Sequence, residues 1–277
     1  MRQQTIHAVE VFRLVSMSKI QHGTKGSDAS GTVLVGCAGW AQISGAKHLS
    51  EMNGSQLERY ASVFPAVEIN SSFYRAHRQT TYRRWADSVP AAFRFSVKLP
   101  RTITHSLRLQ HVDALLTQFQ EETAGLGEKL GCVLVQLPPS LQFDATVADS
   151  FFRKMRSIFQ CMVACEARHA SWFGAEASAV LEKYAITRVR ADPPVGNPGP
   201  HEPTTADAYM RLHGSPRIYY SSYSDTYLAK LAEELAAHAR QHKHTWLIFD
   251  NTASGAALPN ALAVLELVQN PLTKKRG

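Results

Sequence analysis

The 277-residue sequence predicts an α/β protein with a TIM-type barrel, in which eight parallel strands alternate with helices around a ring. Eight short apolar segments alternate with segments of helical periodicity, which is the order expected for a parallel sheet. Eight such units within about 250 residues favour a closed barrel over an open, doubly wound sheet. No GxGxxG follows the first apolar segment and no GxxxxGK[ST] occurs in the chain, which disfavours the common nucleotide-binding folds.

The expected elements follow one another with short connections. The predicted strands cover residues 33–40, 66–74, 93–99, 132–137, 162–168, 186–191, 209–213 and 245–250. The predicted helices cover residues 55–64, 79–88, 112–124, 147–159, 175–184, 225–241 and 255–268. Ser55 and Glu58 have the spacing of a capping box, and Asp225 suits the N-cap of the long helix. Local capping signals therefore agree with the alternation.

One crossover is predicted to lack a helix. Residues 192–206 are rich in proline and glycine, and proline in a helix interior removes a hydrogen bond and clashes with the preceding turn. We therefore expect a single barrel domain over residues 32–270, in which a loop replaces one crossover helix. Residues 1–31 are expected to be a flexible extension, and residues 271–277 a basic tail.

Composition limits the class of partner. Lysine and arginine number 30 against 23 aspartate and glutamate, a formal net charge of +7 that favours a small anionic ligand or nucleic acid. No run of 18 apolar residues and no secretory signal occur, so no membrane partner is expected. The four cysteines form no CxxC pair and suggest reduced core residues of a cytoplasmic protein. The oligomeric state stays open.

Polar side chains recur at alternate positions where the predicted strands end. Residues i and i+2 of a strand share a face, and a strand buried on both faces should be almost wholly apolar. In a TIM-type barrel the active site lies at the carboxyl ends of the strands. The residues are Glu68/Asn70, Ser96/Lys98, Gln136, Glu166/Arg168, Arg190/Asp192, Arg211/His213 and Asp250/Thr252.

These residue types predict an active site that binds an anionic substrate and transfers protons to or from it. Arginine matches the geometry of phosphate or carboxylate, and carboxylates or imidazoles beside cations serve as general acids or bases. The candidate catalytic residues are Glu166, Glu68, His213, His105 and Asp192. The candidate substrate-binding residues are Asn70, Tyr74, Lys98, Gln136, Arg168, Trp172, Arg190 and Arg211.

Two other uses of this set are open. The charged groups could pair with one another and only close the end of the barrel. Alternatively, they could bind a divalent metal, whose ligand types occur at Glu68, Glu166, Asp192, His213 and Asp250. Each carboxylate has a basic neighbour that competes for it, and no HxH spacing appears. No metal ligand and no cofactor is therefore predicted, and a divalent metal remains the alternative.

Several blocks resemble the domain of unknown function 72, or YecE-like, family. They are VGCAGW, VEINSSFYR, FRFSVKLPRTITH, VLVQLPPSLQF, CEARHASWF, RADPP, YMRLHG and FDNTASGAALPNA, in this order over residues 33–268. The resemblance implies a TIM-type barrel and no established reaction. It adds Asn251 to the substrate-binding candidates, whereas Asp250 departs from the family, which more often has asparagine there.

The function expected from these observations is an enzyme acting on an anionic substrate, above all a phosphoester or phosphosugar, at the carboxyl end of the barrel. The first alternative is a protein that binds or processes nucleic acid, because the chain is basic and aromatic residues follow several strands. The second alternative is a metal-dependent sugar isomerase or hydrolase.

Overall fold

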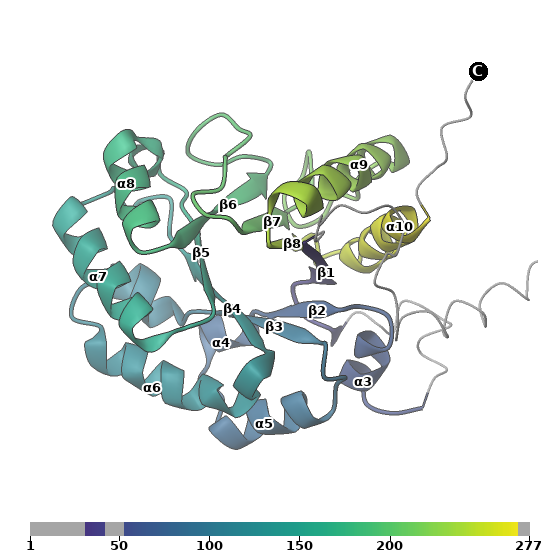
Figure 1. Cartoon of the computed structure of the whole chain (residues 1–277), viewed down its shortest axis with the longest axis horizontal. Helices are drawn as coiled ribbons and strands as arrows, with labels where there is room; N and C mark the ends of the chain where they lie inside the picture. Colours follow the sequence, from purple (N-terminus) through teal and green to yellow (C-terminus); the bar gives the residue numbers. More distant parts are fainter. Residues whose placement is uncertain (1–30, 42–52, 271–277) are drawn as a thin grey trace, which may run out of the picture.

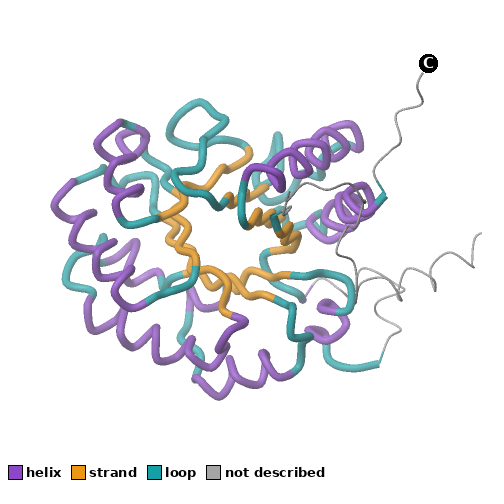
Figure 2. The backbone as a smooth tube through the Cα atoms, viewed as in Figure 1, coloured by secondary structure: helices purple, strands orange, loops and turns teal. Residues whose placement is uncertain are grey.

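The computed structural model describes residues 31–41 and 53–270, and within them eight parallel strands form a ring surrounded by helices (Figures 1 and 2). The predicted TIM-type barrel is confirmed. Each strand pairs with its neighbour in sequence from β2 to β8, and β8 pairs with β1. The strands are β1 (Thr32–Cys37), β2 (Ala66–Ile69), β3 (Arg94–Lys98), β4 (Leu130–Gln136), β5 (Met162–Glu166), β6 (Ile186–Asp192), β7 (Ala208–Leu212) and β8 (His244–Phe249).

Helices fill all the described crossovers but one. Residues 193–207, between β6 and β7, contain no helix, which confirms the predicted loop. The helices are α3 (Gln56–Ala61), α4 (Ser71–Tyr74), α5 (Gln79–Asp87), α6 (Asp113–Thr123), α7 (Ala145–Ile158), α8 (Ala175–Lys183), α9 (Asp225–Gln241) and α10 (Ala257–Gln269). In the described part of the chain, no helix has the length and apolarity needed to cross a bilayer. The predicted extension, apart from Gly31, and the basic tail lie outside the described residues.

Helix starts follow local side-chain chemistry. At α3 the Ser55 hydroxyl accepts from the backbone N–H of Glu58 at 3.2 Å, while the Glu58 carboxylate accepts from the backbone N–H of Ser55 at 2.6 Å. This confirms the capping box. At α9 the N-cap is Ser224, whose hydroxyl accepts from the N–H of Tyr227 at 3.3 Å, so the prediction of Asp225 as N-cap was wrong by one residue.

The second strand is shorter than predicted. Asn70 has helical dihedral angles (φ −91°, ψ −19°), and Ser71–Tyr74 forms one helical turn instead of the end of a strand. The Ser72 hydroxyl donates to the backbone carbonyl of Lys98 at 2.7 Å, which satisfies a polar group at the end of β3. The chain therefore turns across the end of β3, and Tyr74 is left exposed.

The barrel has one discontinuity, which we call the seam, between β1 and β2. Among the described residues a single parallel bridge, Ala38 to Glu68, joins these strands. The hydroxyl of Tyr60, from α3, takes part in the join. It accepts from the backbone N–H of Cys37 at 2.8 Å and donates to the carbonyl of Ala66 at 2.9 Å. The Tyr60 side chain thus connects β1 and β2, whereas the other neighbouring strands are joined by backbone hydrogen bonds.

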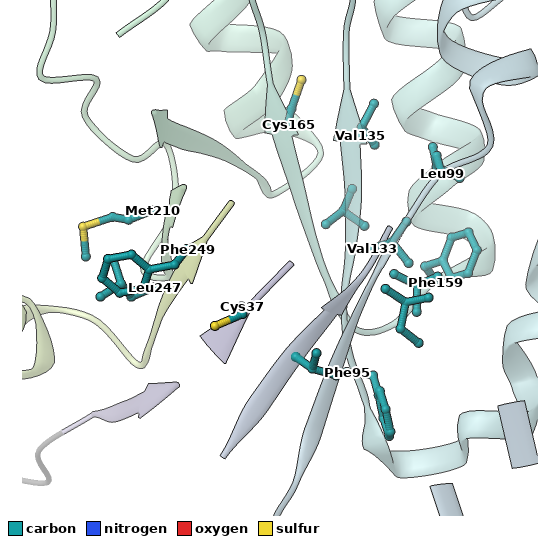
Figure 3. Close-up of a cluster of buried hydrophobic side chains, with 14 of the residues drawn as sticks. Cys37, Phe95, Leu99, Val133, Val135, Phe159, Cys165, Met210, Leu247 and Phe249 are labelled. Carbon is teal, nitrogen blue, oxygen red and sulfur yellow. The ribbon is translucent and has the colours of Figure 1, made fainter. Parts of the chain in front are cut away.

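The core has an inner and an outer part, as expected for a barrel. Alternate residues of each strand separate them, so that Trp246 and Ile248 face inward while Leu247 and Phe249 pack against the helices. Figure 3 shows part of the outer core, with side chains from β1, β3, β4, β5, β7 and β8. All four cysteines are free thiols. The inner core ends below a layer of charged side chains at the carboxyl ends of the strands, which we call the mouth.

Candidate active site at the mouth of the barrel

Arg211 lies at the centre of the mouth. Its guanidinium donates to both carboxylate oxygens of Glu68 at 2.7 and 3.1 Å, to Asp250 Oδ2 at 2.9 Å, and to Glu166 Oε2. Its side chain is 0% exposed. Although burial disfavours the charge, Glu68, Asp250 and Glu166 raise the pKa of Arg211 well above its usual range. One cation therefore organises three carboxylates from β2, β5 and the end of β8.

His213 bridges two of these carboxylates. Its Nδ1 lies 3.0 Å from Asp250 Oδ2, and its Nε2 lies 3.1 Å from Glu166 Oε1. A neutral imidazole would place a lone pair against one carboxylate, whereas an imidazolium donates from both nitrogens. Burial lowers the pKa of His213, but Glu166 and Asp250 outweigh burial and raise it above 6.5. The raised pKa and the two carboxylate contacts both favour the imidazolium.

Arg168 closes the site on the β5 side. Its Nε and Nη2 lie 2.9 and 2.8 Å from Glu166 Oε1. Burial raises the pKa of Glu166, but Arg211, His213 and Arg168 outweigh burial and hold it well below its usual range. Glu166 therefore remains a carboxylate of low basicity. We call the set Glu68, Glu166, Arg168, Arg211, His213 and Asp250 the mouth network.

Tyr209 supports the network from below. Its hydroxyl donates to Glu68 Oε2 and is hydrogen-bonded to Ser96 Oγ, both at 2.8 Å. Tyr209 was not among the residues predicted from the sequence, although it lies two residues before Arg211 on the same strand face. The two-residue period that identified Arg211 and His213 extends to it, so the signal was present.

Lys98, at the end of β3, is buried and unpaired. It is 8% exposed, and its ammonium lies 4.3 Å from the centroid of the Phe73 ring. Among residues 31–41 and 53–270 it has no hydrogen-bond or ion-pair partner, because the mouth carboxylates bind other donors. Burial, then Arg211, lowers the pKa of Lys98 to about 8, against the opposing effect of the carboxylates.

His105 lies on the rim beside Lys98. It belongs to a π-helical turn, Thr102–Ser106, and its ring centroid is 5.0 Å from that of Phe73. Burial lowers the pKa of His105, and the charges of Lys98, Arg101 and Arg168 lower it further. The ring is therefore a neutral imidazole at neutral pH, in contrast to His213.

Two predicted site residues face away from the mouth. Val189 belongs to the inner core, so alternation directs Arg190 and Asp192 outward. Arg190 donates to Glu234 of α9 at 2.9 Å, and Asp192 accepts from the hydroxyl of Tyr227 at 2.7 Å. Their predicted place at the mouth was wrong. These residues attach helix α9 to the barrel.

Trp172 and Asn251 are buried and hold other parts of the chain. The indole N–H of Trp172 donates to the carbonyl of Leu141 at 2.9 Å. The Asn251 amide donates to the Ser221 carbonyl at 3.0 Å and to Asn260 Oδ1 at 2.9 Å, which fixes the segment before α9. The structure therefore does not place either residue with the mouth network.

Asn70 and Gln136 adjoin the mouth network, whereas Tyr74 is exposed. The Asn70 side-chain amide donates to Asp250 Oδ1 at 3.4 Å, and its Oδ1 is buried without a partner among the described residues. Gln136 ends β4 in register beside Glu166 and is buried, with no side-chain hydrogen bond in the described part of the chain. Tyr74 is 80% exposed.

A metal does not fit these residues. Within the described ranges, no three His, Cys, Asp or Glu side chains form a group that could hold a metal ion. The carboxylates of the mouth network already accept from guanidinium and imidazole groups at 2.7–3.1 Å. A divalent cation would have to displace those donors.

The charge of His213 predicts a pH-dependent contribution to stability. Because its pKa is raised in the folded state, its stabilising contribution is complete below 6.5 and disappears as pH rises through the folded value. We expect His213→Gln to lower the free energy of unfolding by more at pH 5.5 than at pH 9. Urea unfolding at both pH values measures this, and an equal loss at both would contradict an imidazolium.

Fold and site together define the class: a TIM-type barrel protein with a buried ionic network at the carboxyl ends of its strands. The sequence model of the family described as "Protein of unknown function DUF72" matches residues 34–276, so the chain belongs to this family. This confirms the resemblance found in the sequence. The family description assigns no reaction, and the function is therefore argued from the site.

Relatives and solved structures agree with this assignment. UPF0759 protein YecE of Escherichia coli K12 is 30% identical over 164 residues, which cover 57% of this chain and 60% of YecE, less than two thirds of its length. UPF0759 protein YunF of Bacillus subtilis is 24% identical, covering 85% of this chain and 94% of YunF. A crystal structure of a DUF72 family protein from Thermotoga maritima, 28% identical, superposes with a TM-score of 0.74 over 86% of this chain and 99% of its own.

Proposed function

We propose that the protein is an enzyme that performs acid–base chemistry on a small anionic substrate, a phosphoester or phosphosugar, at the mouth. Lys98 carries this proposal, because the residue is only 8% exposed and its ammonium has no ion-pair partner among the described residues. The three carboxylates of the mouth network are matched by three cations, Arg211, Arg168 and His213. Lys98 adds a positive charge without a counter-ion, and a buried charge is stabilised when it is paired. An anionic substrate would supply that partner.

The residues divide into two roles in this proposal. Arg168, whose side chain is 15% exposed, and Lys98 bind the anionic group, while the fully buried Arg211 holds the carboxylates in place. The His213 imidazolium is the general acid, and the neutral His105 is the general base. Glu166 has too low a pKa to take up protons near pH 7, so it orients Arg168 and His213.

One observation favours nucleic acid as a second candidate. Tyr74 is 80% exposed, and it shares a surface cavity of about 170 Å³ with Arg75 and Thr102. Exposed aromatic rings beside arginine stack bases in single-stranded nucleic acid. Such binding would weaken steeply with salt, because bound cations release counterions from the backbone.

Thermal unfolding with a panel of phosphate esters tests the proposal. A phosphate ester at 100 times its dissociation constant should add about 2.7 kcal/mol to the free energy of unfolding. We expect Arg168→Ala to abolish this stabilisation, and Arg190→Ala, which changes an arginine of β6 that faces α9, to retain it. No stabilisation by any ester, or equal loss in both variants, would overturn the proposal. Stabilisation by oligonucleotides alone, lost at high salt, would favour the second candidate.

The free thiols support a cytoplasmic location as part of the same proposal. The four cysteines, Cys37, Cys132, Cys161 and Cys165, form no disulfide in the structure. Reduced cysteines are usual in the cytosol, where thiol systems keep them so.

A further inference from the structure

The backbone of Lys98 is held by hydrogen bonds, whereas its ammonium has no hydrogen-bond partner among the described residues. Its carbonyl accepts from the Ser72 hydroxyl at 2.7 Å, and its residue pairs with Leu134 of β4. Its ammonium contacts the face of Phe73 at 4.3 Å and has no oxygen partner among the described residues. An amine held in this way has its nitrogen free to react with a molecule that enters the mouth.

Lys98 loses its proton more readily in the folded protein than a lysine in water does. A solvated lysine has a pKa of about 10.4, so its nitrogen lone pair is almost always protonated at pH 7. Burial and the charge of Arg211 lower the pKa of Lys98 to about 8. Roughly one tenth of the molecules then carry a free amine at pH 7, and about one half do so at pH 8. Lysines of this kind act as bases or form Schiff bases.

A second polar group lies beside Lys98 without a partner. Gln136 is two residues beyond Leu134 on β4, on the same strand face as the residue paired with Lys98. The residue is 7% exposed, and its amide makes no hydrogen bond within the described residues. The amide is therefore free to hydrogen-bond a ligand that enters the mouth.

Building on the proposed function, we propose that Lys98 forms a Schiff base with the carbonyl carbon of an anionic aldehyde or ketone. Arg168 binds the anionic group of that molecule, and the Gln136 amide hydrogen-bonds the oxygen that leaves the carbonyl. The substrate class is thus narrowed to small carbonyl compounds that carry a phosphate or carboxylate.

The step balances in atoms and charge. The neutral amine of Lys98 attacks the carbonyl carbon, a C–N bond forms, and the C=O electron pair moves to the oxygen, which takes a proton from the His213 imidazolium. The nitrogen returns one proton to His213, which gives the carbinolamine. His213 then donates that proton to the hydroxyl, which leaves as water as the C=N bond forms, and it takes the second proton of the nitrogen, so both amine protons end in the water. The net change is amine plus carbonyl to imine plus water, so no oxidant or further reactant is needed.

Borohydride trapping of the full chain tests the proposal. Glycolaldehyde phosphate is the anionic probe, and glycolaldehyde, which lacks only the phosphate, is the neutral one. Hydride reduction of the imine gives a secondary amine, so the protein gains the mass of the aldehyde less one oxygen atom. We expect one adduct, which peptide mapping places on Lys98, and at least tenfold faster labelling with the anionic probe. Labelling should also slow about tenfold for each pH unit below the pKa of about 8.

Two variants control for reaction at surface lysines. Lys98→Arg keeps a positive charge but forms no such imine, and we expect it to lose the adduct. Lys183→Arg changes an exposed lysine that pairs with Asp149, and we expect it to be labelled at the wild-type rate. Mapping of the wild-type adduct does not depend on the folding of either variant. Labelling spread over exposed lysines with no excess at Lys98 would overturn the proposal.

Glycerol phosphate, which has a phosphate but no carbonyl group, distinguishes anion binding at the mouth from Schiff-base formation by Lys98. Stabilisation by glycerol phosphate without an adduct from glycolaldehyde phosphate would overturn the Schiff base and support anion binding. An adduct on Lys98 at equal rates from both aldehydes would support the Schiff base and overturn phosphate recognition. Neither stabilisation nor adduct would overturn both.

Discussion

An Arg211→Met variant is expected to lose about 3–5 kcal/mol of unfolding free energy at pH 7. The substitution removes the cation that donates to Glu68, Glu166 and Asp250, and it leaves buried carboxylates without sufficient compensation. Removing one partner of a buried ion pair is more costly than removing the whole pair. Urea unfolding measures the loss, and part of the stability should return as pH falls and the carboxylates protonate.

Arg190→Met is the matched control. Arg190 also pairs with a glutamate, Glu234, but both side chains are about one third exposed and lie outside the barrel. Partly solvated pairs of this kind contribute about 0–1 kcal/mol. If both variants lost the same free energy, the mouth network would not be the structural centre described above.

Lys98→Met is expected to change stability in the opposite direction. The folded state lowers the pKa of Lys98 from 10.5 to about 8, so folding disfavours its charge at neutral pH. At 1.36 kcal/mol for each pKa unit, the apolar replacement should raise the free energy of unfolding by up to about 3 kcal/mol at pH 7. The same variant should lose stabilisation by phosphate esters.

The pH dependence of the free energy of unfolding tests whether folding lowers the pKa of Lys98. Between pH 8 and 10.5 the unfolded chain binds a proton at Lys98 that the folded chain has released, so wild-type stability should rise with pH in this window. The Lys98→Met variant should lack that rise. Lys183→Met, in which an exposed lysine is changed, should keep it. Destabilisation by Lys98→Met at pH 7 would show that the ammonium has a partner in the folded protein.

Most of the mouth network, and Lys98 beside it, could be predicted because one physical rule covers them. They occupy alternate positions near the ends of apolar strands, where a two-residue period fixes their common face, as at Glu68, Lys98, Glu166, Arg211 and His213. The period does not say which of the two faces is the inner one. Where both faces contain polar residues, as in β6, the choice depends on contacts with α9 that are distant in sequence.

The remaining errors concern interactions between distant segments. The end of β2 depends on a hydrogen bond from Ser72 to the carbonyl of Lys98, a residue of the next strand. Asn251 matched the polar positions of the family, but its partners are Ser221 and Asn260, so its polarity serves a loop. A polar residue at a strand end can satisfy the backbone or a neighbouring chain segment as well as a ligand.

The seam between β1 and β2 gives the mouth network a mechanical consequence. Arg211 donates to Glu68, which belongs to β2, and to Asp250, which follows β8, the neighbour of β1. The guanidinium therefore links the two sides of the seam. An anion that drew Arg211 or its carboxylates toward itself would change the spacing of the two edges without breaking a backbone ladder. A change of charge at the mouth would thus act at the place where, among the described residues, a single backbone bridge joins neighbouring strands.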